Sequence, residues 1–468
     1  MNSNIFRQYD IRGVADRDLT DDAIDLIGRA FASYLVRSPH LDPSPQGGRK
    51  EMEFPGKKPT LVLGRDIRPS SERIFKSLAQ ALLSSGISVT DIGIVTTPVC
   101  YFAIDYFKKS GGIMITGSHN PPEYNGLKLV IGKNSIFGDE IQKIRKLAEK
   151  KDFISETGTL DRAEIIPAYQ AYLKKSFQFK RKLKVVIDSG NGTAGLVAPK
   201  ILRELGHEVI DLFSEPDSRF PNHHPDPTVE ENLKDLIREV KKQRADCGLA
   251  FDGDADRIGV IDDFGTIIWG DKLLILFSRA ILSRHPGATF VADVKCSHLL
   301  FEDVQRHGGK AIMWKTGHSL IKQKLKEVKA DLGGEMSGHM FFADRYFGFD
   351  DGLYAGIRVL EILDQSGKKL SELLSDVPKT YATPEIRVDC PDEEKFKIVA
   401  AVAQFFKSRY PTTDLDGVRI DFGDGWGLVR ASNTQPVLVT RFEAVTEKRL
   451  NEIRKLVEEK INEMRSKK

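Results

Sequence analysis

The chain has 468 residues, which predicts three or four domains, and its 40% hydrophobic and 29% charged residues are typical of a soluble globular protein with large cores. Its net charge of +3 gives no reason to expect a nucleic acid or a membrane surface as a partner, and no apolar run approaches the roughly 20 residues of a membrane span. The four cysteines lie far apart without a C-x-x-C pair, and residues 1–12 lack the apolar core of a signal peptide. Both observations favour a reducing cytoplasm over a disulfide framework, and the cysteine spacing also excludes a zinc site built from them.

A pattern of apolar strand, polar or glycine-rich loop and helix occurs three times along the chain. Its paired strands are expected at 61–63 and 113–115, at 185–187 and 249–251, and at 290–292 and 330–332. Helical stretches, such as 71–84 and 230–242, lie between the members of a pair. The alternation predicts mixed α/β domains, with functional loops at the carboxyl ends of the strands.

The chain after residue 377 has a different order of elements. Strands are expected at 385–388, 417–420, 426–430 and 437–441, and helices at 393–409 and 447–465. This order predicts a smaller α+β domain. We therefore expect domains at 1–160, 161–266, 267–376 and 377–468. The segment 40–59 is rich in proline, glycine and charge, which predicts an exposed insertion without a catalytic role.

The most informative segment is the loop that follows the strand at 113–115. It presents the hydroxyl of Ser118 beside an imidazole and an amide, with the ammonium of Lys128 nearby, and two prolines stiffen its exit. Such a serine is a candidate nucleophile or phosphoryl carrier, although loops of this composition also occur as plain turns. Thr116 and Asn120 occupy the positions where G-x-S-x-G needs glycine, so a serine hydrolase is not indicated.

A second loop carries three carboxylates at alternate positions. Asp252, Asp254 and Asp256 follow the strand at 249–251, and in extended backbone alternate side chains point the same way. Three hard oxygen ligands suit Mg²⁺ or Ca²⁺ better than zinc. An EF-hand is disfavoured because Arg257 and Asp263 stand where glycine and glutamate are required. A solvated acidic turn is the alternative, but carboxylates crowded at a strand end repel one another unless a cation relieves them.

Four other segments carry polar groups that could contact a ligand. The run 430–436 combines a guanidinium, two hydroxyls and free N–H groups, as a phosphate cradle does, although a polar hairpin is the simpler interpretation. The run 334–339 offers a carboxylate, a hydroxyl and an imidazole, which suit sugar hydroxyls. The run 315–318 either caps a following helix or faces a substrate, and Arg12 belongs to a surface turn or contacts an anion. No P-loop sequence is present, so ATP binding is not indicated.

Taken together, these segments resemble the α-D-phosphohexomutase superfamily. The resemblance rests on YDIRG, TGSHNPP, DGDADR, GEMSGH and RASNTQP, which occur in this order over nearly the whole chain. The GEMSGH form, preceded by KTGHS, is most similar to bacterial phosphomannomutase/phosphoglucomutase. The resemblance implies an α/β fold in which three related mixed α/β domains and a C-terminal α+β domain surround a central active-site cleft.

The resemblance also implies roles for individual residues. Ser118 takes the place of the family's phosphoserine, and with Asp252, Asp254 and Asp256 it would hold Mg²⁺. Lys128, Arg257 and His339 would take part in catalysis. The residues implied to bind the substrate are Tyr9, Arg12, Lys295, Gly317, His318, Glu335, Ser337, His339, Arg430, Ser432, Asn433 and Thr434. The implied cofactors are Mg²⁺ and an activating glucose or mannose 1,6-bisphosphate.

The implied reaction moves a phosphoryl group between C1 and C6 of mannose or glucose phosphates through a 1,6-bisphosphate. We expect a cytoplasmic enzyme that is a monomer or a dimer, with a hexose phosphate as its partner and neither nucleic acid nor membrane. A phosphoglucosamine mutase is the alternative within the superfamily. A metal-dependent sugar phosphatase is disfavoured because Asp256 stands where the D-x-D-x-[TV] motif needs threonine or valine, and a non-catalytic sugar-phosphate-binding protein is the remaining alternative.

Overall fold

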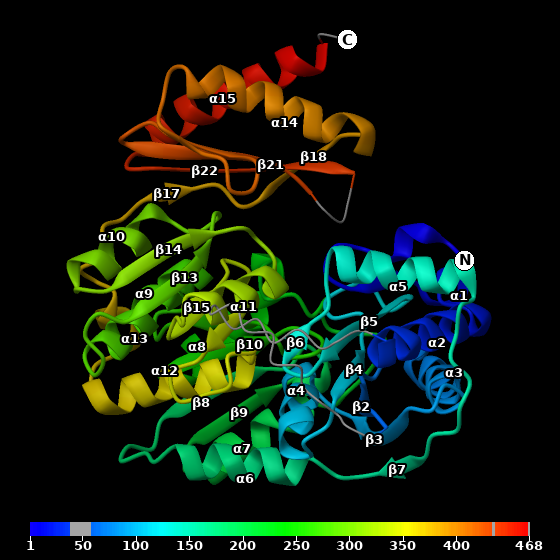
Figure 1. Cartoon of the computed structure of the whole chain (residues 1–468). Coiled ribbons are helices and arrows are strands. Elements are labelled where there is room, and N and C mark those ends of the chain that lie inside the picture. Colours follow the sequence, from blue (N-terminus) through cyan, green and yellow to red (C-terminus); the bar gives the residue numbers. More distant parts are fainter. Residues whose placement is uncertain (38–57, 433–435, 467–468) are drawn as a thin grey trace.

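The structure is a computed structural model that describes residues 1–37, 58–432 and 436–466. Within these residues the strands form four sheets, which follow one another along the chain. Figure 1 shows the first sheet and its helices beside the second and third, with the fourth unit, in orange and red, stacked above them. The predicted insertion at 40–59 lies outside the described residues except at its last two positions, so its role stays a prediction.

The first sheet carries the serine loop. Its strands are β1 (Ile11–Val14), β2 (Thr60–Arg65), β3 (Ser88–Ile94), β4 (Gly111–Ile115), β5 (Tyr124–Ile131), β6 (Asn134–Ser135) and β7 (Leu160–Arg162). The helices of this unit are α1 (Ala15–Asp18), α2 (Asp21–Arg37), α3 (Ser71–Leu83), α4 (Thr97–Tyr106) and α5 (Asp139–Lys150), after a short 3₁₀-helix, η1 (Ser3–Ile5). The central strand β4 is buried along its whole length, as expected of a strand that is covered on both faces.

The second and third sheets are shorter. The second contains β8 (Lys184–Asp188), β9 (Glu208–Leu212), β10 (Cys247–Phe251), β11 (Ile258–Ile261) and β12 (Ile267–Ile268), with α6 (Ile166–Ser176), η2 (Thr193–Leu196), α7 (Ala198–Glu204), η3 (Glu230–Leu233) and α8 (Lys234–Gln243). The third contains β13 (Thr289–Asp293), β14 (Lys310–Trp314), β15 (Leu332–Gly334) and β16 (Met340–Phe342), with α9 (Gly270–Leu282), α10 (His298–Arg306), α11 (His318–Glu327), α12 (Gly352–Ser366) and α13 (Leu370–Leu373).

One strand order recurs in these three sheets. The orders β3-β2-β4-β5, β9-β8-β10-β11 and β14-β13-β15-β16 are equivalent, and in each the first two pairings are parallel and the last is antiparallel. The threefold pattern of the sequence is therefore a structural repeat. The expected strand at 330–332 begins later, at Leu332, because the N–H of Ala330 still bonds to the end of α11, at the Leu325 carbonyl.

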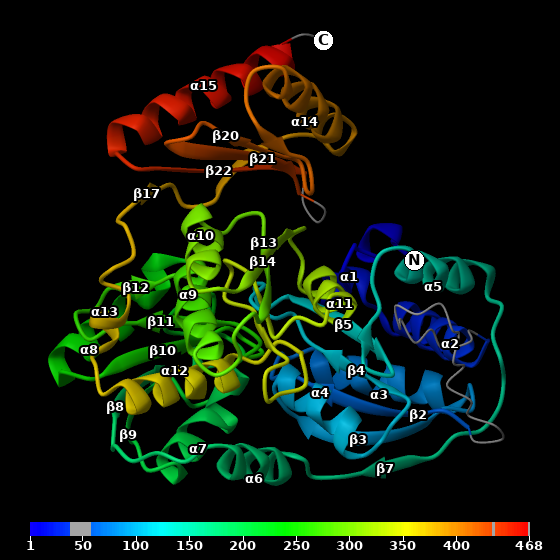
Figure 2. The ribbon, with the colours of Figure 1, turned by 60° about the vertical axis from the view of Figure 1, so that its left-hand side comes forward.

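The fourth sheet is antiparallel, as predicted for an α+β unit. It contains β17 (Tyr381–Ala382), β18 (Ile386–Asp389), β19 (Thr412–Thr413), β20 (Val418–Asp421), β21 (Gly425–Ala431) and β22 (Val437–Ala444), and its helices are α14 (Asp392–Lys407) and α15 (Glu447–Ser466). Figures 1 and 2 show both helices on the side of the sheet that faces away from the other three units. The predicted fold class is confirmed.

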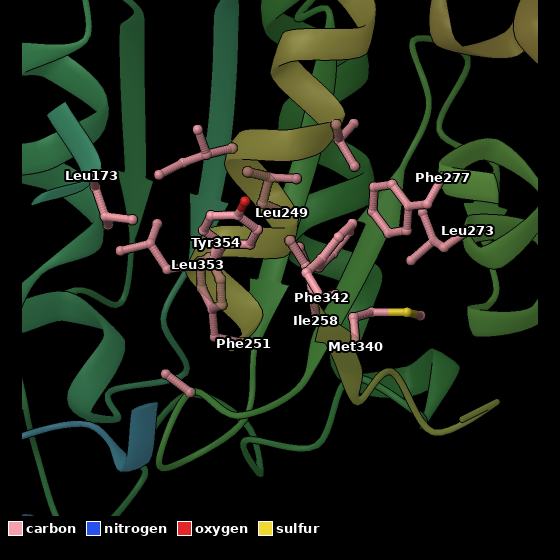
Figure 3. Close-up of a cluster of buried hydrophobic side chains, with 14 of the residues drawn as sticks. Leu173, Leu249, Phe251, Ile258, Leu273, Phe277, Met340, Phe342, Leu353 and Tyr354 are labelled. Atoms are coloured by element: carbon pink, nitrogen blue, oxygen red, sulfur yellow. The ribbon is translucent and has the colours of Figure 1, made fainter. Parts of the chain in front are cut away.

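Helix α12 joins the second and third units through a shared core. Its residues are buried from Gly352 to Leu363, and it packs on β10 and β11 of the second sheet as well as on β16 of the third. Figure 3 shows Leu249 and Ile258 of the second sheet beside Leu353 and Tyr354 of this helix. The loops that follow β10 and β15 are thus fixed relative to each other by packed side chains. Among the described helices, none combines the length and apolar character that a membrane span requires.

Candidate active site

Three loops at equivalent places in the repeat meet at one site. Each follows the third strand of its repeat: the Ser118 loop follows β4, the aspartate loop follows β10, and the Glu335 loop follows β15. The loops touch one another, since Ser118 bonds to Asp252 and Arg257 contacts His339. The repeat therefore delivers one hydroxyl-bearing, one acidic and one imidazole-bearing loop to a common point.

Ser118 is held in a conformation that few residues other than glycine adopt. Its φ is +50° and its side chain is buried. Its Oγ donates a hydrogen bond to Oδ2 of Asp252 over 2.8 Å and lies 3.2 Å from Nδ1 of His119. Its own N–H donates to Oγ1 of Thr116. The hydroxyl thus points at the aspartate loop of the next repeat, which is the position a phosphoryl carrier beside a metal would need.

Arg68 fixes the backbone of the serine loop, and it was not among the residues predicted from the sequence. Its guanidinium donates to the carbonyls of Ser118, Asn120, Pro121 and Tyr124 over 2.5–2.9 Å. Asp66 pairs with its Nε at 3.1 Å, and Asp66 also accepts from the N–H of Gly117. The side chain of Arg68 is only 1% exposed, so a buried charge holds the strained loop in place.

The three aspartates form a cluster that fits a magnesium ion. Asp252, Asp254 and Asp256 are fully buried, and each places one oxygen within 4.8 Å of the others. Lys128 on β5 reaches across from the first sheet, 2.7 Å from Asp254 and in close contact with Asp256. Oδ1 of Asp254 has no hydrogen-bond partner among the described residues. All-oxygen donors and an unpartnered buried carboxylate oxygen match the preference of Mg²⁺.

The charges in this cluster shift one another. Burial and the neighbouring carboxylates raise the pKa of Asp252 well above its usual range. Burial also opposes ionisation of Asp254, but the Lys128 ammonium outweighs it and lowers the pKa of that aspartate. Burial would lower the pKa of Lys128, yet Asp254 and Asp256 raise it well above its usual value. One ammonium therefore compensates a crowd of carboxylates only in part, and a divalent cation would complete the compensation.

A glycine lets the first two loops approach closely. A Cβ placed on Gly253 would lie 2.4 Å from the carbonyl oxygen of Ser118, which is too close for any side chain at this position. The first residue of α4, Thr97, also holds this loop: its N–H donates to the carbonyl of Asp254, and its hydroxyl donates to Oδ2 of the same residue. Backbone contact and the start of α4 together fix the aspartates relative to the serine.

His339 connects the third loop to the cluster. Its Nε2 lies 3.2 Å from Oδ1 of Asp256 and its Nδ1 lies 3.0 Å from Oε2 of Glu335. Burial alone would lower the pKa of His339, but these two carboxylates raise it to about 9. Arg257 places its Nε 3.3 Å from Nε2 of the same imidazole, and Ser337 its Oγ 3.1 Å from Nδ1. The imidazole is therefore protonated at neutral pH and oriented from both sides.

Other predicted substrate residues lie around this centre. The Tyr9 hydroxyl donates to the carbonyl of Thr316 over 2.8 Å, which links the first and third units. The Tyr9 ring lies 2.5 Å from where a Cβ on Gly317 would be, so this position, with φ +134°, needs glycine. The His318 ring meets Tyr9 edge-on and stacks on His339, and burial lowers its pKa well below the usual value. Arg12 is largely buried in β1 and donates to Oδ1 of Asn120, so it is not part of a surface turn.

The remaining predicted residues lie where the fourth unit meets the third. Lys295, in the loop after β13, pairs with Glu385 at 3.2 Å. Arg430 on β21 donates to Oδ2 of Asp416, and the N–H of Thr316 in the third unit donates to the same oxygen. Ser432 is buried beside this arginine, while Asn433 and Thr434 lie outside the described residues. The structure thus separates a serine–aspartate–histidine centre from a basic group on the fourth unit.

Comparison with known proteins agrees with this geometry. Four family descriptions match: phosphoglucomutase/phosphomannomutase alpha/beta/alpha domain I at residues 3–155, domain II at 167–265, domain III at 269–381 and the C-terminal domain at 385–460. A Pseudomonas aeruginosa protein named phosphomannomutase/phosphoglucomutase is 46% identical over 97% of this chain and 94% of its own length. A Neisseria gonorrhoeae phosphoglucomutase is 44% identical over 96% and 95%. The crystal structure of a phosphoglucomutase/phosphomannomutase family protein from Burkholderia thailandensis has a TM-score of 0.89 at 40% identity, covering 99% of this chain and 98% of its own.

Proposed function

Because the chain belongs to the phosphoglucomutase/phosphomannomutase family, we propose that it interconverts the 1-phosphates and 6-phosphates of glucose and mannose, with Ser118 as the phosphoryl carrier. One observation supports this proposal above the others. The Ser118 hydroxyl is held in a strained loop, buried, and 2.8 Å from a carboxylate of a three-aspartate cluster. Such an arrangement suits repeated gain and loss of a phosphoryl group at one oxygen.

The aspartate cluster is the proposed metal site. Asp252, Asp254 and Asp256, together with an oxygen on phosphorylated Ser118, would hold Mg²⁺, whose charge would offset that of the transferring phosphoryl group. Lys128 adds a fixed positive charge from the first sheet, 2.7 Å from Asp254. We propose that these charges lower the barrier to transfer and that the strained loop keeps the serine oxygen in line with the sugar hydroxyl.

His339 and Lys128 are the proposed proton carriers. Both are protonated in the arrangement described, so each can donate to the serine oxygen as its phosphoryl group leaves. In the opposite direction, a deprotonated group has to accept the proton of the attacking sugar hydroxyl. His339, with a pKa of about 9, loses its own proton more readily than Lys128, so we propose His339 as this acceptor. Arg257, in contact with His339, is placed to stabilise charge on the phosphoryl oxygens.

The second phosphate of the bisphosphate intermediate would bind at the fourth unit. Arg430, Ser432 and Lys295 supply donors there, and Asn433 and Thr434 are proposed to join them. Because the intermediate has to turn end for end, the contacts of Glu335, Ser337 and His318 with sugar hydroxyls would serve two orientations. The proposed activator is glucose or mannose 1,6-bisphosphate, which would phosphorylate Ser118. All four cysteines are buried and free, which supports the proposal of a reducing cytoplasm.

Substitution of the carrier tests the proposal. We expect Ser118→Ala to lose at least about a thousandfold in kcat, since the variant lacks the oxygen that carries the phosphoryl group, while it still binds glucose 6-phosphate by calorimetry. Mass spectrometry of wild-type enzyme incubated with glucose 1,6-bisphosphate should find phosphate on Ser118, and phosphate on Asp252 would point instead to a phosphatase. Full turnover in the alanine variant would contradict the scheme. The ratios of kcat/KM for glucose, mannose and glucosamine 1-phosphates would then assign the substrate.

A further inference from the structure

A second group of potential metal ligands lies next to the three aspartates. It consists of Asp256, His339 and Asp350, each buried, with one ligand atom per residue within 4.8 Å of the others. Asp350 lies two residues before the start of α12 and was not among the residues predicted from the sequence. The group differs from the three aspartates in chemistry, because it adds an imidazole nitrogen to carboxylate oxygens. That donor set suits zinc and its transition-metal neighbours better than magnesium.

One oxygen of each carboxylate is bound to a lysine, and the other is placed where it could bind a metal ion. Lys128 holds Oδ2 of Asp256, and Lys322 on α11 donates to Oδ1 of Asp350 over 3.0 Å. Oδ2 of Asp350 has no hydrogen-bond partner among the described residues, with Nδ1 of His318 3.7 Å away, and Oδ1 of Asp256 faces Nε2 of His339, the third ligand of the group, at 3.2 Å. Both carboxylate side chains are essentially unexposed. A buried carboxylate oxygen without a partner is costly, and the place of this one beside a second carboxylate and an imidazole indicates a missing cation.

The histidine of the group is already set up as a ligand. Glu335 lies 3.0 Å from its Nδ1, which leaves Nε2 facing Asp256 at 3.2 Å. A carboxylate on the far nitrogen is the usual support of a metal-bound imidazole. Ligand atoms of a tetrahedral zinc ion lie about 3.3 Å apart, so the pair already has a suitable separation. The Asp350 oxygen, which lies within 4.8 Å of both, would have to move by at most about 1.5 Å.

We propose that Asp256, His339 and Asp350 bind a transition-metal ion such as Zn²⁺, and that the bound ion inhibits the enzyme. The ion takes the place of the proton on Nε2 of His339, which is released to solvent, and displaces the Arg257 guanidinium, which lies 3.3 Å from that nitrogen. Asp256 is common to this site and the proposed magnesium site, so both ions can be present at once with one carboxylate between them. Inhibition rests on the proposed function of His339, whereas binding of the ion does not.

Metal binding is tested without any enzymatic assay. Co²⁺ is titrated into the full-length Asp254→Asn variant, which lacks a ligand of the three-aspartate site but keeps all three ligands of the second. We expect visible absorption bands typical of tetrahedral Co²⁺ with a nitrogen ligand, and their loss when Asp350→Asn is added. Bands of equal strength in the double variant would overturn the proposal. Asp331→Asn, which alters an aspartate paired with the exposed His285, is the matched control and should leave the bands unchanged.

Inhibition is tested with Zn²⁺ in the presence of saturating Mg²⁺. We expect the zinc concentration for half-inhibition of the wild type to be independent of added Mg²⁺ and to rise at least about tenfold in Asp350→Asn, each activity being compared with that of the same variant without zinc. Relief of inhibition in proportion to Mg²⁺ would place zinc at the three aspartates and overturn the proposal. If the variant does not fold, zinc-edge anomalous diffraction from wild-type crystals decides: a peak between Asp256, His339 and Asp350 supports the site, and peaks only elsewhere refute it.

Discussion

At the scale of single residues, the serine loop depends on the buried charge of Arg68. Arg68 uses its planar guanidinium to collect the carbonyls of the turn, and lysine could not serve all of them from one point. One of these carbonyls belongs to Ser118 itself, the residue whose φ is +50°. The strain at Ser118 is therefore offset by hydrogen bonds at its neighbours, as is common where a reactive group has to be aimed.

We predict that Arg68→Lys lowers kcat by roughly a hundredfold and leaves KM within a few-fold of the wild type. The expected cause is a shift of the Ser118 oxygen out of line, and the rate of phosphorylation by glucose 1,6-bisphosphate should fall in parallel. Stability should also fall, by about 1–3 kcal/mol for each buried carbonyl left unpaired. Arg65→Lys is the control, since Arg65 lies on the preceding strand and pairs with Asp91, away from the loop. Equal kinetic losses in both variants would contradict a positioning role for Arg68.

A buried histidine outside the site links folding to pH. His207 is 4% exposed, accepts a long bond of 3.4 Å from the N–H of Leu183, and packs its ring edge-on against Phe179. Burial lowers the pKa of His207 to about 4, against about 6.5 in the unfolded chain. Between these values the unfolded chain binds a proton here and the folded chain does not. Acidification from pH 6.5 to 4 therefore lowers the free energy of unfolding by up to about 3 kcal/mol through this residue.

We predict that His207→Gln makes the melting temperature less dependent on pH between 6.5 and 4. Glutamine can still accept from Leu183 but takes up no proton, so its melting temperature should decline less steeply than that of the wild type in calorimetric scans. His285→Gln, which replaces a largely exposed histidine, should follow the wild-type profile. If the melting temperatures of wild type and His207→Gln changed with pH in parallel, protonation of this imidazole would not be linked to folding.

At the scale of elements, the repeat explains how far the sequence could be interpreted. The apolar runs of β4 and β10 are followed within three residues by Ser118 and Asp252, so each strand and its reactive loop could be predicted together. Arg68 was not visible, because its burial results from contacts with carbonyls about fifty residues away. Asp350 was hidden for a related reason, since its place depends on α12 crossing to the second sheet. Local pattern predicts elements, whereas long-range packing decides which polar residues they enclose.

The start of α4 offers two adjacent threonines with separable tasks. Thr96 caps the helix by accepting from the N–H of Val99, while the hydroxyl of Thr97 donates to Oδ2 of Asp254 over 2.5 Å. We predict that Thr97→Val weakens Mg²⁺ binding by about tenfold, because an outer partner that orients a metal ligand is lost. Thr96→Val should cost about 1 kcal/mol of stability and leave Mg²⁺ affinity unchanged. Calorimetric Mg²⁺ titration of both variants distinguishes these effects, and equal affinities would refute the assignment of Thr97.

At the scale of the whole molecule, the fourth unit is attached to the loop that carries Lys295. The guanidinium of Arg419, stacked 3.8 Å from the Trp426 ring, donates to the carbonyls of Val294 and Cys296 over 2.6 and 2.7 Å. Arg441 reaches the carbonyl of Lys295, and the hydroxyl of Ser297 donates to Glu443. The basic residues proposed to hold the distant phosphate thus lie on both sides of a joint that combines these polar contacts with a small apolar cluster of Val294, Trp426 and Leu428. Figure 2 shows this fourth unit above the third, joined by the chain at β17.

We predict that Arg419→Met loosens this joint and raises KM for glucose 1-phosphate about tenfold with little change in kcat. Two buried carbonyls lose their donor, so the docked arrangement is destabilised relative to a separated one, while the serine and aspartate loops remain intact. Small-angle scattering should register a larger radius of gyration for the variant in the absence of substrate. Arg449→Met removes an arginine of the same unit that pairs only at the surface, with Asp424 and Glu452, and should change neither quantity. A loss of kcat at unchanged KM would instead show that the joint acts on the chemical step.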